Sequence, residues 1–240
     1  MLKKGLINIS IILASLLLFT SCDSAGVNEN ADIFAKYVQF SLNKFFGAEP
    51  DSLKNRIYYS FYDASKHVKF VRRINVNNTG IDKLPSDIAK FSKLEGLEVA
   101  FNKLGAMPEE VTKLENLAFL DLSHNKIEKL PEPIFNMVSL KVLKLNSNKI
   151  DTIPDSMGYL EDLEELYLND NKIEYLPDSF KRLKHLKRLS IASNKLRSIP
   201  NVLSNLKNLE YLDLSNLYIE KIDVEKKNII SQLPNTVIIW

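Results

Sequence analysis

The amino-acid sequence predicts an α/β solenoid in which a parallel sheet runs along one side of a stack of similar units. Three observations predict this fold. Leucine and isoleucine recur with a period of 23 residues through most of the chain. Apolar residues two apart within each period indicate a short strand, because alternate side chains of a strand share one face. An asparagine and a proline then follow at fixed places, which is typical of stacked repeats.

The composition is that of a folded protein with balanced charge. The 240 residues are 45% hydrophobic and 26% charged, so the chain can bury a sizeable core. Of 32 Lys and Arg, two (Lys3 and Lys4) lie in a segment that we expect to be removed, which leaves 30 basic and 30 acidic residues. A protein without net positive charge lacks the usual footprint of nucleic-acid binding, so we expect no nucleic-acid partner.

Residues 1–21 have the layout of a secretory signal. The N-terminal end carries Lys3 and Lys4. An apolar stretch from Leu6 to Phe19 follows, and then the small polar residues Thr20 and Ser21. The apolar stretch is shorter than the ~20 residues that span a bilayer, and polar residues interrupt it. The sequence therefore predicts export rather than a transmembrane helix.

Cys22 is the one cysteine of the chain, so it cannot form an intramolecular disulfide. The run from Leu18 to Cys22 resembles the lipobox of bacterial lipoproteins, in a relaxed form with Phe19 that resembles spirochaete or Bacteroidetes lipoproteins. The resemblance implies a lipoprotein signal peptide at 1–21, acylation of Cys22 with fatty acids such as palmitate, and a tether at 22–30. It also implies a lipid anchor in a membrane of the bacterial cell envelope, with the outer membrane favoured, and a domain that faces the periplasm or the exterior. The alternative is an ordinary cleaved signal with an incidental cysteine.

Residues 31–70 are expected to form a helical N-terminal cap. Six apolar residues follow a helical period: Ile33, Phe34, Tyr37, Val38, Leu42 and Phe45. A second helix is expected after Pro50, using Leu53, Ile57 and Phe61. These helices would cover the open end of the repeat core.

Seven units span residues 71–231 and begin at Val71, Leu94, Leu117, Leu140, Leu163, Leu186 and Leu209. In the third unit Leu120 and Leu122 face the core, so residues 119 and 121 face solvent. Each asparagine ends a strand, where its amide can satisfy backbone groups of the turn. Apolar residues three apart after each proline indicate a helical turn, and the proline stiffens this return half.

This pattern resembles the 23-residue leucine-rich repeat, LxxLxLxxNxLxxLPxxIxxLxx. The resemblance implies a horseshoe with the parallel sheet on its concave face, and a role as a protein-binding module. The passage from His67 to Pro85 is similar to the start of the repeats in spirochaete leucine-rich repeat proteins. Alternation at Val237 and Ile239 predicts a capping strand within residues 232–240.

The sequence contains little that indicates catalysis. The three histidines are far apart, and the common nucleotide-binding, metalloprotease and hydrolase motifs do not occur. His124, Ser147 and Asp170 share one place in successive units, but this order puts the histidine ~10 Å from the aspartate, which does not suit a catalytic triad. We therefore expect no enzyme activity, no metal and no cofactor.

The concave face is the predicted binding site. Apolar, aromatic or arginine residues stand at outward strand positions where the fold does not require burial, as binding hot spots do. The candidate partner-binding residues are Phe119, Val142, Tyr167, Arg188 and Tyr211. We expect a monomeric protein-binding module whose partner is another protein. The alternative is a passive structural envelope lipoprotein without a specific partner.

Overall fold

The computed structural model describes residue 53, residues 55–220 and residues 222–240. The predicted signal peptide (1–21), Cys22 with its tether (22–30) and the helix predicted between Ile33 and Phe45 lie outside the described residues. The unit that spans Lys54–Trp240 is described below.

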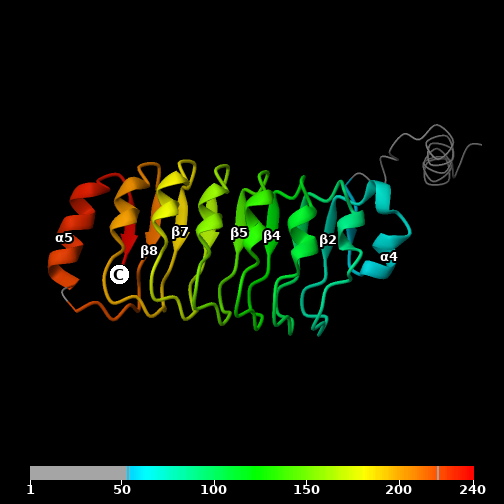
Figure 1. Cartoon of the computed structure of the whole chain (residues 1–240), viewed down its shortest axis with the longest axis horizontal. Coiled ribbons are helices and arrows are strands. Elements are labelled where there is room, and N and C mark those ends of the chain that lie inside the picture. Colours follow the sequence, from blue (N-terminus) through cyan, green and yellow to red (C-terminus); the bar gives the residue numbers. More distant parts are fainter. Residues whose placement is uncertain (1–52, 54, 221) are drawn as a thin grey trace, which may run out of the picture. The chain divides into compact units, whose positions relative to one another are not determined.

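Within the described residues, nine parallel strands form one open sheet in which spatial order follows chain order. Figure 1 shows the strands side by side, with short helical turns in a second layer. The strands are β1 (Ile57–Tyr58), β2 (Arg73–Asn75), β3 (Gly96–Glu98), β4 (Phe119–Asp121), β5 (Val142–Lys144), β6 (Glu165–Tyr167), β7 (Arg188–Ser190), β8 (Tyr211–Asp213) and β9 (Val237–Ile239). The predicted capping strand is β9, which pairs with β8.

The 23-residue period appears directly in the strand register. Leu97, Leu120, Leu143, Leu166 and Leu189 are paired in sequence across five neighbouring strands. All five side chains are fully buried. A core residue of each unit therefore packs on its counterpart in the next, which builds one continuous core.

Helical turns form the return layer opposite the sheet. Its elements are the five-residue helix α4 (Phe61–Ser65), the 3-10 helices η1 (Val68–Phe70), η2 (Ile88–Lys90), η3 (Glu109–Lys113), η4 (Glu132–Asn136), η5 (Asp155–Tyr159), η6 (Asp178–Arg182) and η7 (Asn201–Asn205), and α5 (Ile222–Gln232). From η2 to η7 the repeat proline precedes the helix and its carbonyl accepts the first helical hydrogen bond, as Pro154 does from Met157 at 3.0 Å. A 3-10 helix is tighter than an α-helix, so these short turns form a compact second layer.

The repeat asparagines form a ladder of stacked, buried side chains: Asn102, Asn125, Asn148, Asn171 and Asn194. Asn148 is representative. Its amide nitrogen donates to the carbonyls of Leu122 (2.9 Å) and Leu145 (3.0 Å), and its Oδ1 accepts from the Ile127 amide at 3.0 Å. Each asparagine thus joins the turn of its own unit to that of the preceding unit.

The residue before each ladder position has a left-handed backbone. These residues are Asn78, Phe101, His124, Ser147, Asp170, Ser193 and Asn216, with φ between 50° and 57°. Left-handed backbone is costly for residues with a Cβ atom, and the regular stack imposes it at every turn. The sequence analysis did not predict this feature, since none of these residues is glycine.

The prediction of a helix through Ile57 is wrong. Ile57 and Tyr58 form β1 and pair with Arg73 and Ile74 of β2. Ser60 explains the difference, because its hydroxyl accepts from the Asp63 amide and caps the helix that begins at Phe61. The segment before Ser60 instead extends the sheet and buries Tyr58. At the other end, the last return half is the 11-residue helix α5 rather than a 3-10 turn.

Candidate protein-binding face

The solvent side of the sheet carries the third and fifth residues of each repeat, and we call it the strand face. In β4, β5 and β6 the middle residue is fully buried, while the flanking residues are half-buried. The strand register sets two rows across the face. One row runs Phe119, Val142, Glu165, Arg188 and Tyr211, and the other runs Asp121, Lys144, Tyr167, Ser190 and Asp213.

A depression of about 530 Å³ lies over β4, β5 and β6. Its lining residues are Phe119, Val142, Lys144, Asn146, Glu165, Tyr167 and Asn169. Phe119, Val142 and Tyr167, which the sequence analysis selected, therefore lie around one hollow. Arg188 follows on β7 and Tyr211 on β8. Participation of all five residues in binding stays a prediction.

Lys144 lies between two aromatic rings of the depression. Its Nζ is 5.2 Å from the centre of the Phe119 ring and 5.9 Å from that of Tyr167. The nearest carboxylate oxygen is Asp121 Oδ2 at 3.9 Å, which makes an ion pair but not a hydrogen bond. Its outward strand position places Lys144 here, although the sequence analysis did not include it among the candidate residues. Asn146 and Asn169 were also missed, because they lie two residues beyond the strand positions considered.

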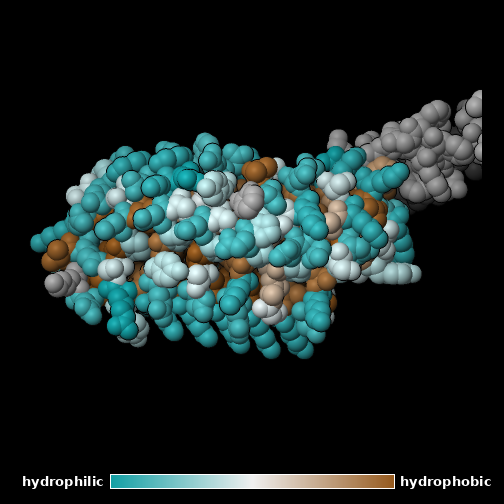
Figure 2. All heavy atoms as spheres, in the orientation of Figure 1, coloured by the Kyte–Doolittle hydropathy of each residue, from teal (hydrophilic) through white to brown (hydrophobic). Residues whose placement is uncertain are grey.

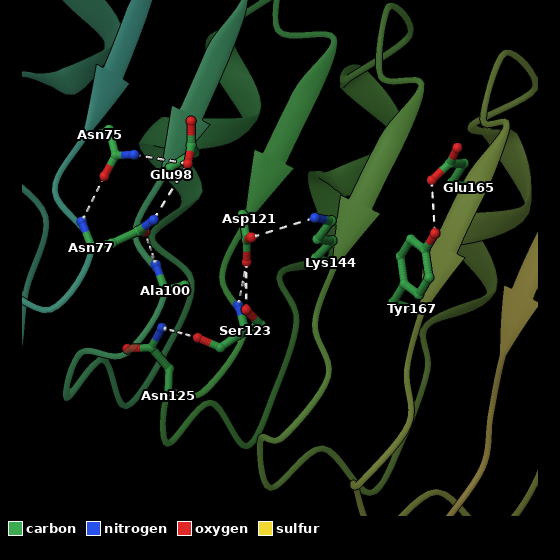
Figure 3. Close-up of polar contacts among 10 residues, drawn as sticks. All are labelled: Asn75, Asn77, Glu98, Ala100, Asp121, Ser123, Asn125, Lys144, Glu165 and Tyr167. Atoms are coloured by element: carbon green, nitrogen blue, oxygen red, sulfur yellow. Dashed lines mark hydrogen bonds and ion pairs between the residues drawn. The ribbon is translucent and has the colours of Figure 1, made fainter. Parts of the chain in front are cut away.

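Tyr167 has its hydroxyl fixed by its own strand, as Figure 3 shows. The hydroxyl donates to Glu165 Oε2 at 2.8 Å. Burial raises the pKa of Tyr167, and the bond to Glu165 raises it further. The ring is thereby held in one orientation at the edge of the depression, and an anchor that is already ordered loses less entropy on binding.

Two positions of the strand face are buried rather than open to solvent. Gly96 lies beneath the side chain of Arg73, with 3.7 Å from its ideal Cβ position to Arg73 Cγ. Ser190 is only 4% exposed and donates to Asp213 Oδ2 at 3.1 Å. Small side chains at these positions let their neighbours cover them, so the alternation of a strand alone does not predict exposure.

A second hollow of about 320 Å³ lies where the strands begin. It is lined by Lys141, Asp162, Glu164, His185, Lys187, Asn208 and Glu210. Its charges are largely paired with one another: Lys187 donates to Glu164 at 2.7 Å, and this hydrogen bond lowers the pKa of Glu164. The hollow has little unpaired charge with which to select a ligand.

The histidine, serine and aspartate that share one place in successive units form no catalytic triad. His124, Ser147 and Asp170 all lie in left-handed turns. The His124 ring stacks on exposed Phe101 with 4.1 Å between ring centres, and Asp170 accepts from Asn169. Within the described residues no group of three or more His, Cys, Asp or Glu could hold a metal ion. The same part of the chain contains no helix long and apolar enough to cross a membrane.

The geometry defines a class of protein: a repeat solenoid with an exposed sheet face and an aromatic-lined hollow. A family model described as leucine-rich repeat region matches residues 132–236, and one described as leucine rich repeat matches residues 116–137. No curated protein matches the chain.

Two solved structures share the fold. A leucine-rich repeat protein of Leptospira interrogans is 32% identical with a TM-score of 0.64, over 71% of this chain and 42% of that one. An internalin of Listeria monocytogenes is 24% identical with a TM-score of 0.63, over 75% of this chain and 50% of that one. The chain is therefore a leucine-rich repeat protein that spans half or less of the length of these two relatives. Its fold is one that typically serves protein interaction, and neither family model is catalytic.

Proposed function

We propose that the chain is a lipid-anchored protein of the bacterial cell envelope that binds another protein through its strand face. The depression over β4, β5 and β6 is the observation that carries this proposal. Phe119, Val142 and Tyr167 surround it, at positions where the repeat requires no apolar residue. Figure 2 shows the other side, over the helical layer, as mostly hydrophilic with single hydrophobic residues between the polar ones. Aromatic side chains around a hollow are the usual composition of a binding hot spot.

The binding test compares two pairs of aromatic truncations. Phe119→Ala with Tyr167→Ala removes the anchors of the strand face. Tyr159→Ala with Tyr175→Ala is the matched control, because these tyrosines are 50% and 55% exposed and lie outside the strands. Proteins captured from envelope extracts by the wild type are identified, purified and titrated against both variants. Truncation of central anchors costs about 2 kcal/mol or more, so we expect the first pair to weaken binding at least tenfold.

Both variants should fold like the wild type, since none of the four side chains belongs to the buried core. Equal affinity of the wild type and the strand-face variant would contradict binding through this face. Loss of affinity in the control pair alone would place the contact outside the strand face.

The lipid anchor is proposed from the sequence around Cys22. The motif implies acylation of this cysteine, and more than one acyl chain is needed for stable attachment. Cys22→Ala should abolish metabolic labelling with palmitate and move the protein from the membrane fraction to the soluble fraction. Cys22→Ser, which keeps the size of the side chain, should behave in the same way. Labelling that persists in either variant would contradict the lipoprotein assignment.

A further inference from the structure

Acidic and basic side chains of the strand face differ in how they are hydrogen-bonded. All four carboxylates accept hydrogen bonds from side chains of the strands or of the turns that follow them: Glu98 from Asn75 and Asn77, Asp121 from Ser123, Glu165 from Tyr167, and Asp213 from Ser190 and Ser215. Figure 3 shows the first three of these groups. A partner that covers them removes water from acceptors that already have donors.

Lys144 is in the opposite situation. Its side chain is 36% exposed, and its ammonium makes no hydrogen bond within the described part of the chain. Asp121, 3.9 Å away, uses its other oxygen to accept from both the amide and the hydroxyl of Ser123, at 2.9 and 2.6 Å. Water therefore satisfies the donors of Lys144 as long as the depression is open.

Arg188 repeats this arrangement two strands away. Its Nε is 3.9 Å from Glu165 Oε1, and its side chain is 54% exposed. Arg188 also lies close enough to the Tyr167 hydroxyl to act against the rise of its pKa. A guanidinium carries five N–H donors, so these two contacts leave others available. Lys144 on β5 and Arg188 on β7 are separated by two strand spacings, about 10 Å.

These differences select the charge of the partner. A protein that fills the depression must displace the water around Lys144, and a buried ammonium without an acceptor is costly. An apolar or basic surface would leave that cost uncompensated. A carboxylate would offset it through charge-assisted hydrogen bonds, while apolar neighbours of the carboxylate could contact Phe119 and Val142.

We propose that the strand face recognises an acidic segment of its partner protein, with one carboxylate bound by Lys144, a second by Arg188, and apolar side chains against Phe119 and Val142. A separation of about 10 Å corresponds to three residues of extended chain. The segment would therefore carry two acidic residues close together, with aliphatic or aromatic residues between or beside them. This inference rests on the proposed function and specifies the chemistry of its partner.

A display library of random 12-residue peptides tests the inference directly, because the selection itself reveals which chemistry the strand face prefers. Peptides are selected on the wild-type protein and then depleted on the Phe119→Ala/Tyr167→Ala variant. We expect the remaining peptides to be enriched in Asp and Glu next to apolar residues. The most enriched sequence is synthesised and titrated against the wild type and single variants by calorimetry.

Lys144→Met and Arg188→Met keep most of the side-chain volume and remove the charge. Each should raise the dissociation constant about tenfold, and replacing the peptide's Glu by Gln should have a similar effect. The peptide change and Lys144→Met should be non-additive if the two groups contact each other. Lys172→Met is the control, since this exposed lysine lies at the turn edge and should change affinity less than twofold.

Three results would overturn the inference. Selection of basic or uncharged peptides that still require Phe119 and Tyr167 would contradict the acidic partner and leave the proposed function intact. Selected peptides that bind the Phe119→Ala/Tyr167→Ala variant with the same affinity as the wild type would contradict both the acidic partner and the proposed function. Absence of any enriched peptide would contradict recognition of a short acidic segment.

Discussion

Asn148→Ala is the most informative change to the repeat architecture. The side chain bonds three carbonyls and one amide, but the carbonyls have other donors. Leu122 also accepts from Asn125, Leu145 from Asn171, and Asn146 from the His124 amide. The buried Ile127 amide is the group that the substitution leaves without a hydrogen-bond partner.

A buried N–H without a hydrogen-bond acceptor costs about 1–3 kcal/mol, so Asn148→Ala should lower the free energy of unfolding by that amount. Lys149→Ala is the neighbouring control. Its ion pair with Glu128 is 3.8 Å long and exposed, so its loss should cost less than ~1 kcal/mol. Urea unfolding followed by circular dichroism gives both values. Amide hydrogen exchange should show faster exchange at Ile127 in Asn148→Ala alone.

Asn148→Asp adds a pH dependence with a defined sign. The carboxylate would keep an acceptor for Ile127 but would point its second oxygen at the carbonyls of Leu122 and Leu145. These carbonyls disfavour the charged form, which raises the pKa of the introduced group in the folded state. The variant should therefore lose stability as pH rises above about 4, the ordinary range of an aspartate. Equal, small losses for the alanine variants of Asn148 and Lys149, or an unchanged exchange rate at Ile127, would refute the ladder's role.

Three further changes test local features. Ser147→Gly should raise the free energy of unfolding by about 0.5–1 kcal/mol, because Ser147 has a φ of 55°, and Ser147→Ala should give no such gain in the same urea titration. Gly158→Ala should lower the free energy of unfolding by about 1–3 kcal/mol, since a Cβ there would overlap the Ser179 carbonyl group; an unchanged midpoint would mean that the helical turns can separate. Tyr58→Phe should leave the free energy of unfolding unchanged or raise it by about 1 kcal/mol, because the buried hydroxyl has no hydrogen-bond partner among the described residues. Burial raises the pKa of Tyr58, so the wild type should lose stability as pH rises above about 10, and Tyr58→Phe should lose less.

The repeat core could be predicted from sequence because period and alternation are local properties. Leu120 and Leu122 are buried as expected, and the repeat asparagines occupy their ladder. The fate of Ile57 could not be predicted in this way. Its apolar spacing fits a helix, whereas the Ser60 cap and the free edge of β2 decide that it forms a strand.

The candidate site was only partly predictable for a related reason. Outward positions follow from alternation, and these brought Phe119, Val142 and Tyr167 to attention. Whether a side chain there is covered depends on neighbouring strands, as the buried Ser190 shows. Lys144 lacks a hydrogen bond to Asp121, whose other oxygen accepts from Ser123. This is a relation between residues 23 positions apart, which the sequence pattern does not show.

Site-specific photocrosslinking in cells that make the protein tests the central claim most directly. A photoreactive phenylalanine replaces Asn146, which lines the depression without belonging to the proposed anchors. The same residue at Tyr175, outside the strand face, is the control. The account predicts that illumination joins the chain to a distinct protein from position 146 and not from position 175. An adduct from position 175 alone, or no protein adduct from position 146, would contradict protein binding through the strand face.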